Sequence, residues 1–277
     1  MKPLLIDSHA HLDQECFAVD LEDVITRAHN AGVTRLVTIG AGGGHDEEHP
    51  NGLGSAHRAI NLVKKFPSIF AAVGVHPHDA GGAADHPSYR TTLLDLAAHP
   101  KVVAIGEIGL DFFRDWSPIE AQRKVFREQI FVALEVKKPL IIHSRNTQGL
   151  NDAGQECLAT LRALGAEKIG GVFHCFSESA EFARELRDIN FKVSFPGSLT
   201  FRKASLLREI AKEIPIEQIL VETDAPYMAP EPYRGKRCES MYVNEVALVL
   251  SEIKGIPYEE CCRIVTKNTL DLFPAML

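Results

Sequence analysis

The sequence predicts an α/β fold, and more specifically a single (β/α)8 barrel that takes up residues 1–277 as one domain. The length of 277 residues suits one such barrel, which typically needs about 250 residues. Short apolar runs rich in β-branched residues begin roughly every 30 residues, which is the length of one βα unit. Because these runs are almost continuously apolar, they favour parallel strands buried on both faces. An open doubly wound sheet is the alternative, but no Gly-x-Gly-x-x-Gly motif opens a helix after the first strand.

Eight runs are predicted to form the strands of the barrel. In chain order they are Leu4–Ser8, Arg35–Ile39, Ile69–Gly74, Val102–Glu107, Pro139–His143, Gly170–Phe173, Phe191–Ser194 and Ile219–Glu222. Helical patterns fill the intervals between them. In one interval a capping box is predicted at 117–120, with Pro118 at the first helical position. Apolar residues then recur at helical spacing at Phe126, Ile130 and Ala133.

Two more amphipathic patterns predict helices near 182–189 and 243–253. Three segments lack a periodic pattern and are predicted to be loops, at 41–55, 79–87 and 225–239. The first is rich in glycine and charge, so we expect a mobile surface loop there. The third holds three prolines and follows the last strand, so we expect it to shape a site.

Composition and charge restrict the class of protein. Hydrophobic residues make up 45% and charged residues 24% of the chain, which excludes disordered, fibrous and disulfide-scaffold proteins. The net charge of −7 and the pI near 6.0 argue against a broad basic nucleic-acid surface, although bound metal ions would add local positive charge. No apolar run approaches the roughly 18 residues of a membrane span, and no signal peptide precedes the first strand, so we expect a cytoplasmic protein. The six cysteines form no Cys-x-x-Cys pair, so we expect reduced thiols.

Residues that can bind metal ions follow several of the predicted strands. His9 and His11 are two residues apart, and in a strand that spacing projects both side chains to the same side. Polar residues also end the fourth, fifth, sixth and eighth strands, namely Glu107, His143, His174, Glu222 and Asp224. In a barrel these strand ends share the rim where active sites lie. The set exceeds the three protein ligands of one open tetrahedral ion, whereas two ions about 3.5–4 Å apart that share a carboxylate would use it.

Eight segments, spread over nearly the whole chain, carry a further signal. They read DSHAHLD at 7–13, GVHPHDA at 74–80, GEIGLDF at 106–112, IHSR at 142–145, FHCFS at 173–177, SLTFRKA at 198–204, VETDAPYMAP at 221–230 and PYRGKR at 232–237. In this order the segments resemble the TatD family of metal-dependent deoxyribonucleases, within the amidohydrolase-like metal hydrolases.

The resemblance implies two divalent metal ions, Zn²⁺, Mn²⁺ or Mg²⁺, and DNA as substrate. Glu107 would bridge the ions, and Asp224 would bind the first ion and act as the catalytic base toward a shared water. The full set of implied ligands is His9, His11, Glu107, His143, His174 and Asp224. The implied reaction is hydrolysis of single-stranded or frayed DNA from a 3′ end. Crowded rims of this kind can also hold a third ion.

Four further residues are predicted to bind substrate, namely His76, Arg145, Arg234 and Arg237. The planar guanidinium of Arg145 can donate two hydrogen bonds to a phosphate, and the alternative is a salt bridge to Glu107 or Asp111. The two arginines of the last loop can also belong to a solvated charge run, and His76 can simply cap its loop.

Several neighbouring residues have more than one interpretation. Glu222 is predicted to orient a ligand rather than to bind an ion. Phe112, Phe113 and Trp116 follow the bridging glutamate and can either stack on a nucleobase or pack as core or lid.

Two rival functions follow from the same residues. A two-metal centre can also hydrolyse a carboxylic ester, amide or lactone, and the acidic net charge favours this rival, whereas the nearby arginines count against it. A non-catalytic nucleic-acid-binding scaffold would need gaps in the ligand set, and all six implied ligands are present. Neither a membrane nor an obligate protein partner is predicted.

Overall fold

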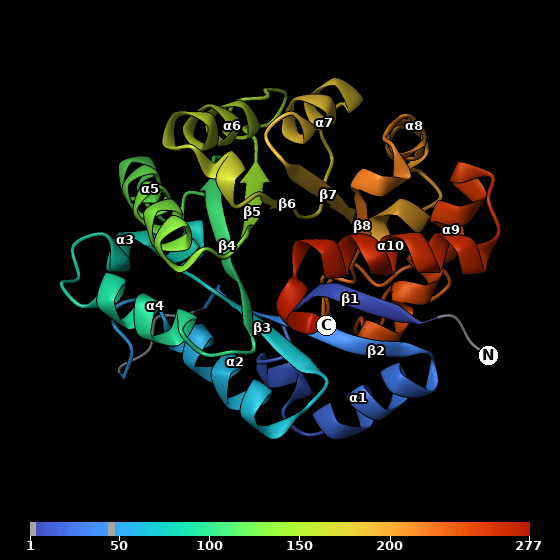
Figure 1. Ribbon diagram of the computed structural model, residues 1–277, viewed down its shortest axis with the longest axis horizontal. Coiled ribbons are helices and arrows are strands. Elements are labelled where there is room, and N and C mark those ends of the chain that lie inside the picture. Colours follow the sequence, from blue (N-terminus) through green and yellow to red (C-terminus); the bar gives the residue numbers. More distant parts are fainter. Residues whose placement is uncertain (1–3, 44–47) are drawn as a thin grey trace.

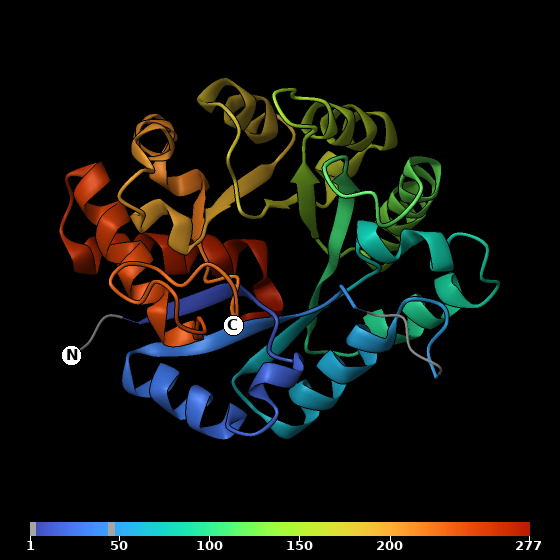
Figure 2. The ribbon, with the colours of Figure 1, turned by 180° about the vertical axis from the view of Figure 1, so that it is seen from behind.

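The computed structural model describes residues 4–43 and 48–277, and it contains the predicted barrel. Eight parallel strands pair in chain order, so each strand hydrogen-bonds to the next one along the chain. Figures 1 and 2 show this ring of strands from opposite sides, with the helices arranged around its outside. The strands are β1 Leu5–Ala10, β2 Val33–Gly40, β3 Ile69–Val73, β4 Val102–Asp111, β5 Leu140–Arg145, β6 Gly171–Phe173, β7 Phe191–Phe195 and β8 Ile219–Val221. The predicted fold class is confirmed.

The helices among the described residues cover the strands from outside. They are α1 Leu21–Asn30, α2 Gly54–Lys65, α3 Ala80–Ala83, α4 Tyr89–Ala97, α5 Ile119–Val136, α6 Ala153–Leu164, α7 Ala180–Arg187, α8 Ser205–Glu213, α9 Val243–Lys254 and α10 Tyr258–Leu272. The three helices predicted from periodicity are confirmed as α5, α7 and α9. None of the described helices is long and apolar enough to cross a membrane.

The capping box predicted for α5 is wrong. The helix begins at Ile119 and Pro118 is its N-cap residue, so Ser117 lies one position too early to cap it. The Ser117 hydroxyl instead accepts a hydrogen bond from the backbone N–H of Gly81 at 2.5 Å. A tertiary contact has therefore taken the side chain that the local pattern assigned to the helix.

Strand β4 is longer than predicted, because it continues to Asp111 instead of ending at Glu107. Its pairing with β5 is irregular between Ile105 and Ile108, a bulge that includes Glu107. Gly106 stands in this bulge, where a Cβ atom would come 2.6 Å from a side-chain carbon of β5. Bulges re-aim side chains, and this one lies where the sheet presents its central carboxylate.

The barrel closes at a seam between β1 and β8 that depends on polar contacts. The described residues contain only an isolated bridge there, at Ala10. Thr223 donates hydrogen bonds from its backbone N–H and its hydroxyl to the two carboxylate oxygens of Asp7, at 2.9 and 2.7 Å. The backbone N–H of Asp224 donates to the His9 carbonyl at 2.9 Å. The seam therefore places the His-x-His pair beside Asp224.

The C-terminal segment closes one end of the barrel. Leu272, Phe273 and Met276 form one apolar cluster with inward-facing residues from most of the strands. Phe273 and Met276 are almost completely buried, and Figure 1 shows the C-terminus near the middle of the ring. A ligand can therefore enter the barrel only from the opposite end, where the carboxyl ends of the strands lie.

The loop predicted at 41–55 is only partly a surface loop. Helix α2 begins at Gly54, and Leu53 and Ser55 are fully buried, since the apolar Leu53 packs into the core. Residues 44–47 lie outside the described residues.

The other two predicted loops have different outcomes. The segment 79–87 contains the short helix α3, because Ala80 and Ala83 are buried against the core. The segment 225–239 is irregular as predicted, and it contributes Tyr227 and Met228 to the lining of the main pocket.

Asp7 offers a pH-dependent test of the seam. Burial raises the pKa of the Asp7 carboxyl to about 7, from an ordinary value of 3.8. The folded state therefore prefers the neutral carboxyl, and the stability that this form contributes is lost as pH rises from about 4 to 7. The Asp7→Asn side chain stays neutral, so the unfolding free energy of this variant should rise relative to the native protein by on the order of 3 kcal/mol between pH 4 and 8.

Chemical denaturation of the metal-free proteins at the two pH values measures this difference. The exposed Asp95 provides the control, since Asp95→Asn should show no such change. If the difference in unfolding free energy between Asp7→Asn and the native protein did not change with pH, the raised pKa of the buried Asp7 carboxyl would be contradicted.

Candidate active site

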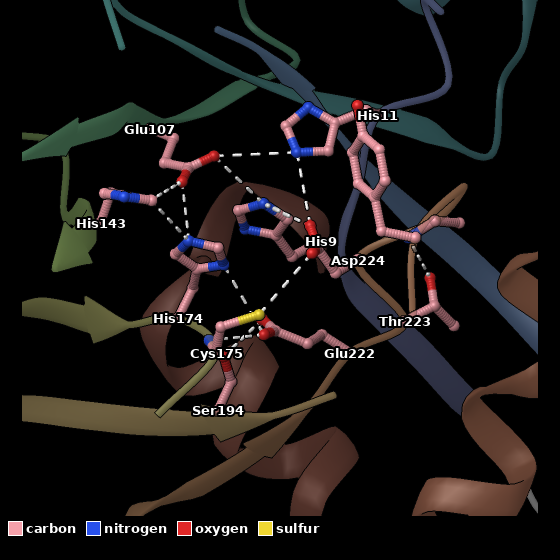
Figure 3. Close-up of polar contacts among 12 residues, drawn as sticks. His9, His11, Glu107, His143, His174, Cys175, Ser194, Glu222, Thr223 and Asp224 are labelled. Atoms are coloured by element: carbon pink, nitrogen blue, oxygen red, sulfur yellow. Dashed lines mark hydrogen bonds and ion pairs between the residues drawn. The ribbon is translucent and has the colours of Figure 1, made fainter. Parts of the chain in front are cut away.

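A buried carboxylate lies at the centre of the candidate site (Figure 3). Glu107 on β4 is 2% exposed, and histidines from β1, β3, β5 and β6 or from the residues just after them converge on it. The nitrogens within 4 Å of its oxygens are His143 Nδ1 and His174 Nε2, both at 2.7 Å, His76 Nε2 at 3.3 Å, His9 Nε2 at 3.4 Å and His11 Nε2 at 3.7 Å. One oxygen, Oε2, faces the two histidines of β1, and Oε1 faces the others.

Asp224 forms a second acidic group beside the first. Its Oδ1 lies 3.4 Å from His11 Nε2 and 3.6 Å from His9 Nε2. The Asp224 backbone is left-handed, with φ of 54°, and the seam holds it there. Side chains two residues apart on β1 point to the same side, so His9 and His11 both face Asp224 and Glu107.

The chemistry of these donors fits divalent cations. Both ring nitrogens of His9 and Nδ1 of His174 are buried without a hydrogen-bond partner among the described residues. Such orphaned nitrogens are costly unless something binds them. Possible ligand atoms also lie within 4.8 Å of one another in trios, including His9–His11–Glu107, His9–His174–Asp224 and Glu107–His143–His174.

The charge states of His9, Glu107 and Asp224 suit cation binding. Burial lowers the pKa of His9, so this imidazole is neutral near pH 7. Burial opposes ionisation of Glu107, but the imidazoles of His174, His76 and His143 together hold the Glu107 pKa well below its usual value. Burial opposes ionisation of Asp224 in the same way, and the hydrogen bond from His11 lowers its pKa. Two carboxylates and a neutral imidazole therefore offer lone pairs without first losing a proton.

Asp111, which the sequence analysis considered only as an alternative salt-bridge partner of Arg145, holds one of the histidines in place. Its Oδ2 lies 3.2 Å from His143 Nε2 and 2.6 Å from His78 Nε2. Because Nε2 of His143 faces this carboxylate, Nδ1 is the nitrogen that faces Glu107 and can bind a cation. Burial opposes ionisation of Asp111, but the hydrogen bonds of His143 and His78 hold its pKa below the usual range. Asp111 lies four residues after Glu107 on β4, a spacing that the predicted end of the strand concealed.

Glu222 contacts the turn that follows β6. Its Oε1 accepts a hydrogen bond from the Cys175 backbone N–H at 2.7 Å and lies 3.7 Å from His174 Nδ1. The Ser194 hydroxyl donates to its other oxygen. Cys175 has a left-handed backbone, with φ of 47°, directly after His174. These contacts fix the turn that presents His174.

A pocket of about 1080 Å³ opens over this cluster. It is large enough for a ligand of nucleotide size. Its lining includes His11, His76, Glu107, His143, His174, Asp224, Arg145 and Tyr227. The carboxyl ends of strands from all around the barrel thus face one cavity.

Two of the four predicted substrate residues lie in this pocket. His76 accepts a hydrogen bond at Nδ1 from the His78 backbone N–H at 3.1 Å, and burial lowers its pKa to about 3, so the ring is neutral. Arg145 forms no ion pair within the described residues, and its guanidinium lies 4.2 Å from the centre of the Phe113 ring. The alternative salt bridge of Arg145 to Glu107 or Asp111 is not formed.

The other two predicted substrate residues do not line the pocket. Arg234 lies over the Phe201 ring, with its guanidinium carbon 3.7 Å from the ring centre. Arg237 is paired with Asp20 at 2.6 Å and with Glu239 at 3.0 Å. The charge of Arg237 is therefore balanced inside the protein.

Comparisons with known proteins identify the family of the chain. Residues 6–274 match the family model described as TatD related DNase. The chain belongs to this family. A Bacillus subtilis (strain 168) protein named uncharacterized metal-dependent hydrolase YabD is 42% identical over 98% of this chain and 99% of its own. An Escherichia fergusonii protein named 3'-5' ssDNA/RNA exonuclease TatD is 31% identical over 96% of both chains. The crystal structure of YJJV, a TatD homolog from Escherichia coli K12, has a TM-score of 0.83 at 28% identity and covers 99% of both chains.

The contact between Asp111 and His143 predicts how tightly this TatD-family site binds metal. In Asp111→Asn the carboxylate that fixes the His143 ring is lost, so we expect the affinity for Zn²⁺ to fall by about 10- to 100-fold. Competition with a chromophoric chelator measures it. The exposed Asp95→Asn variant is the matched control and should bind Zn²⁺ as the native protein does. An Asp111→Asn variant with native affinity would show that this carboxylate does not orient the ligand.

Proposed function

We propose that this protein is a metal-dependent hydrolase that cleaves the phosphodiester bonds of single-stranded DNA from a 3′ end, with two divalent ions per chain. The observation that carries the proposal is a single pocket in which the metal-binding side chains around Glu107 meet the Arg145 guanidinium, which has no carboxylate partner. The names of the YabD and TatD relatives support a metal-dependent hydrolase and a nucleic-acid substrate, respectively. The proposed location is the cytoplasm, with no obligate protein partner.

Two ions would lie on either side of Glu107. Glu107 Oε2 lies 3.4 Å from His9 and 3.7 Å from His11 at the end of β1. Glu107 Oε1 lies 2.7 Å from His143 on β5 and 2.7 Å from His174 after β6. Asp224 would complete the first set of ligands. The histidine-rich set suits Zn²⁺ or Mn²⁺, and Mg²⁺ can support turnover although it prefers oxygen ligands. Bound ions would lower the pKa of a water molecule and stabilise charge on the phosphoryl oxygens.

Asp224 is proposed as the general base. Its Oδ1 faces His11 at 3.4 Å, whereas Oδ2 lies 3.7 Å from the Cys175 thiol at the pocket. One oxygen can therefore hold a cation while the other accepts the proton of the attacking water. As the new P–O bond forms and the bond to the 3′-oxygen breaks, the same carboxyl can return the proton to the leaving oxygen.

Arg145 and His76 are the proposed contacts to the phosphate. The planar guanidinium of Arg145 can donate two hydrogen bonds to phosphoryl oxygens, and no carboxylate of the described chain competes for it. The neutral ring of His76 can donate from Nε2. Arg234 can contact only a part of the strand outside the pocket lining, and Arg237 is left out because its charge is already balanced.

Removing the proposed base should abolish most of the activity. On 5′-labelled single-stranded DNA, the metal-loaded native protein should shorten the strand stepwise from its 3′ end. Asp224→Asn should lower that rate by about 100- to 10,000-fold, because the amide cannot accept the proton, with only a modest loss of bound metal. Gel analysis of the time course, together with metal analysis of each protein, measures both effects.

The exposed Asp95→Asn variant should keep the native rate. An Asp224→Asn variant that cleaves at the native rate would remove Asp224 as the base. DNA left intact by the metal-loaded native protein, together with turnover of a carboxylic ester, amide or lactone, would overturn the proposed substrate class.

A further inference from the structure

Exposed aromatic and arginine side chains gather at the mouth of the pocket. Phe113 and Trp116, in the segment between β4 and α5, are 45% and 64% exposed. Arg114 and Trp116 line the pocket together with Arg145 at the end of β5. Phe112, by contrast, packs against the apolar core. Phe113, Arg114, Trp116 and Arg145 are called the mouth cluster below.

The two arginines of the mouth cluster are held by aromatic rings and not by carboxylates. The Arg114 guanidinium carbon lies 5.4 Å from the centre of the Phe113 ring and 5.3 Å from that of Trp116, and Arg145 lies 4.2 Å from Phe113. Within the described residues neither arginine forms an ion pair, whereas Arg237 has two carboxylate partners. In a chain with a net charge of −7, two unbalanced cations beside the candidate metal centre favour a ligand with several negative charges.

The mouth cluster is anchored to the metal-binding residues through Asp111. Asp111 Oδ1 accepts hydrogen bonds from the backbone N–H groups of Phe113 and Arg114, each at 2.9 Å. Its Oδ2 lies 2.6 Å from His78 Nε2, and the His78 ring packs against Trp116 with the ring centres 4.4 Å apart. The same oxygen lies 3.2 Å from Nε2 of the proposed ligand His143. The Asp111 carboxylate thus fixes both His143, a proposed metal ligand, and the loop that carries Trp116.

We propose that the mouth cluster is a binding subsite for single-stranded nucleic acid, in which Trp116 stacks on an unpaired base next to the scissile phosphate. Arg114 and Arg145 bind the phosphates that flank this base. The proposal rests on the proposed function, to which it adds the residues that would hold the unpaired strand. In a duplex the faces of a base are covered by neighbouring bases, so only an unpaired base can offer a face to the indole.

Trp116 is the only tryptophan of the chain, so its fluorescence reports directly on this subsite. The full-length protein in excess chelator, where no cleavage occurs, is titrated with decathymidylate, with an abasic decamer of the same phosphate count and with a decamer duplex. Decathymidylate should quench the fluorescence. The abasic strand should need an about 5- to 150-fold higher concentration, because it lacks the stacking contribution. Equal quenching by both single strands, or none by either, would overturn the stacking proposal.

A kinetic comparison separates stacking from a structural effect of the substitution. In Trp116→Ala the ratio of kcat/KM for a normal strand to kcat/KM for a strand that is abasic next to the cleaved bond should fall about 5- to 150-fold. Trp116→Phe should restore most of the ratio, since it keeps a ring. Phe131→Ala is the matched control, because Phe131 is 49% exposed on α5 and does not line the pocket.

The two failures are distinguishable. A native ratio in Trp116→Ala, in a protein that still cleaves DNA, would remove the subsite and leave the proposed function standing. Failure of the metal-loaded native protein to cleave any strand would refute the proposed function, and the fluorescence titration would then decide the subsite without catalysis.

Discussion

The arrangement of this protein depends on one buried carboxylate, Glu107, which five imidazole rings contact within 4 Å. An isolated charge in a barrel interior would be strongly unfavourable, so Glu107 is stable there only while positive or hydrogen-bonding groups surround it. Those groups come from four different strands, and only a barrel brings the carboxyl ends of all of them to one place. Both ring nitrogens of His9 nevertheless lack a hydrogen-bond partner among the described residues, which leaves them able to bind a cation.

Irregular backbone does as much as regular strands to build the cluster. A bulge in β4 presents Glu107, and the polar seam between β1 and β8 carries Asp224 in a left-handed conformation next to the His-x-His pair. Asp111 then links the cluster to its surroundings, since it orients His143, binds His78 and fixes the loop after β4. Changes to that loop should therefore affect the proposed metal ligands as well as the proposed contact with DNA.

The strands and most of the candidate site could be predicted from the sequence, because the spacing of the strands and the positions of polar residues at their ends are local signals. Seven of the eight predicted strands agree with the structure to within two residues, and the histidines were named from strand ends and spacing. What was missed depends on tertiary contacts. Ser117 bonds to Gly81 instead of capping α5, and Arg237 pairs with Asp20, a residue more than two hundred positions away. Arg237 is close to Asp224 in the sequence, but it does not line the pocket that Asp224 lines.

We propose that two metal ions share Glu107. A crystal of the protein grown with Mn²⁺, with anomalous diffraction collected at the manganese edge, tests it most directly. We expect two anomalous peaks flanking Glu107, one beside His9, His11 and Asp224 and the other beside His143 and His174. A single peak, or peaks that do not touch Glu107, would contradict it.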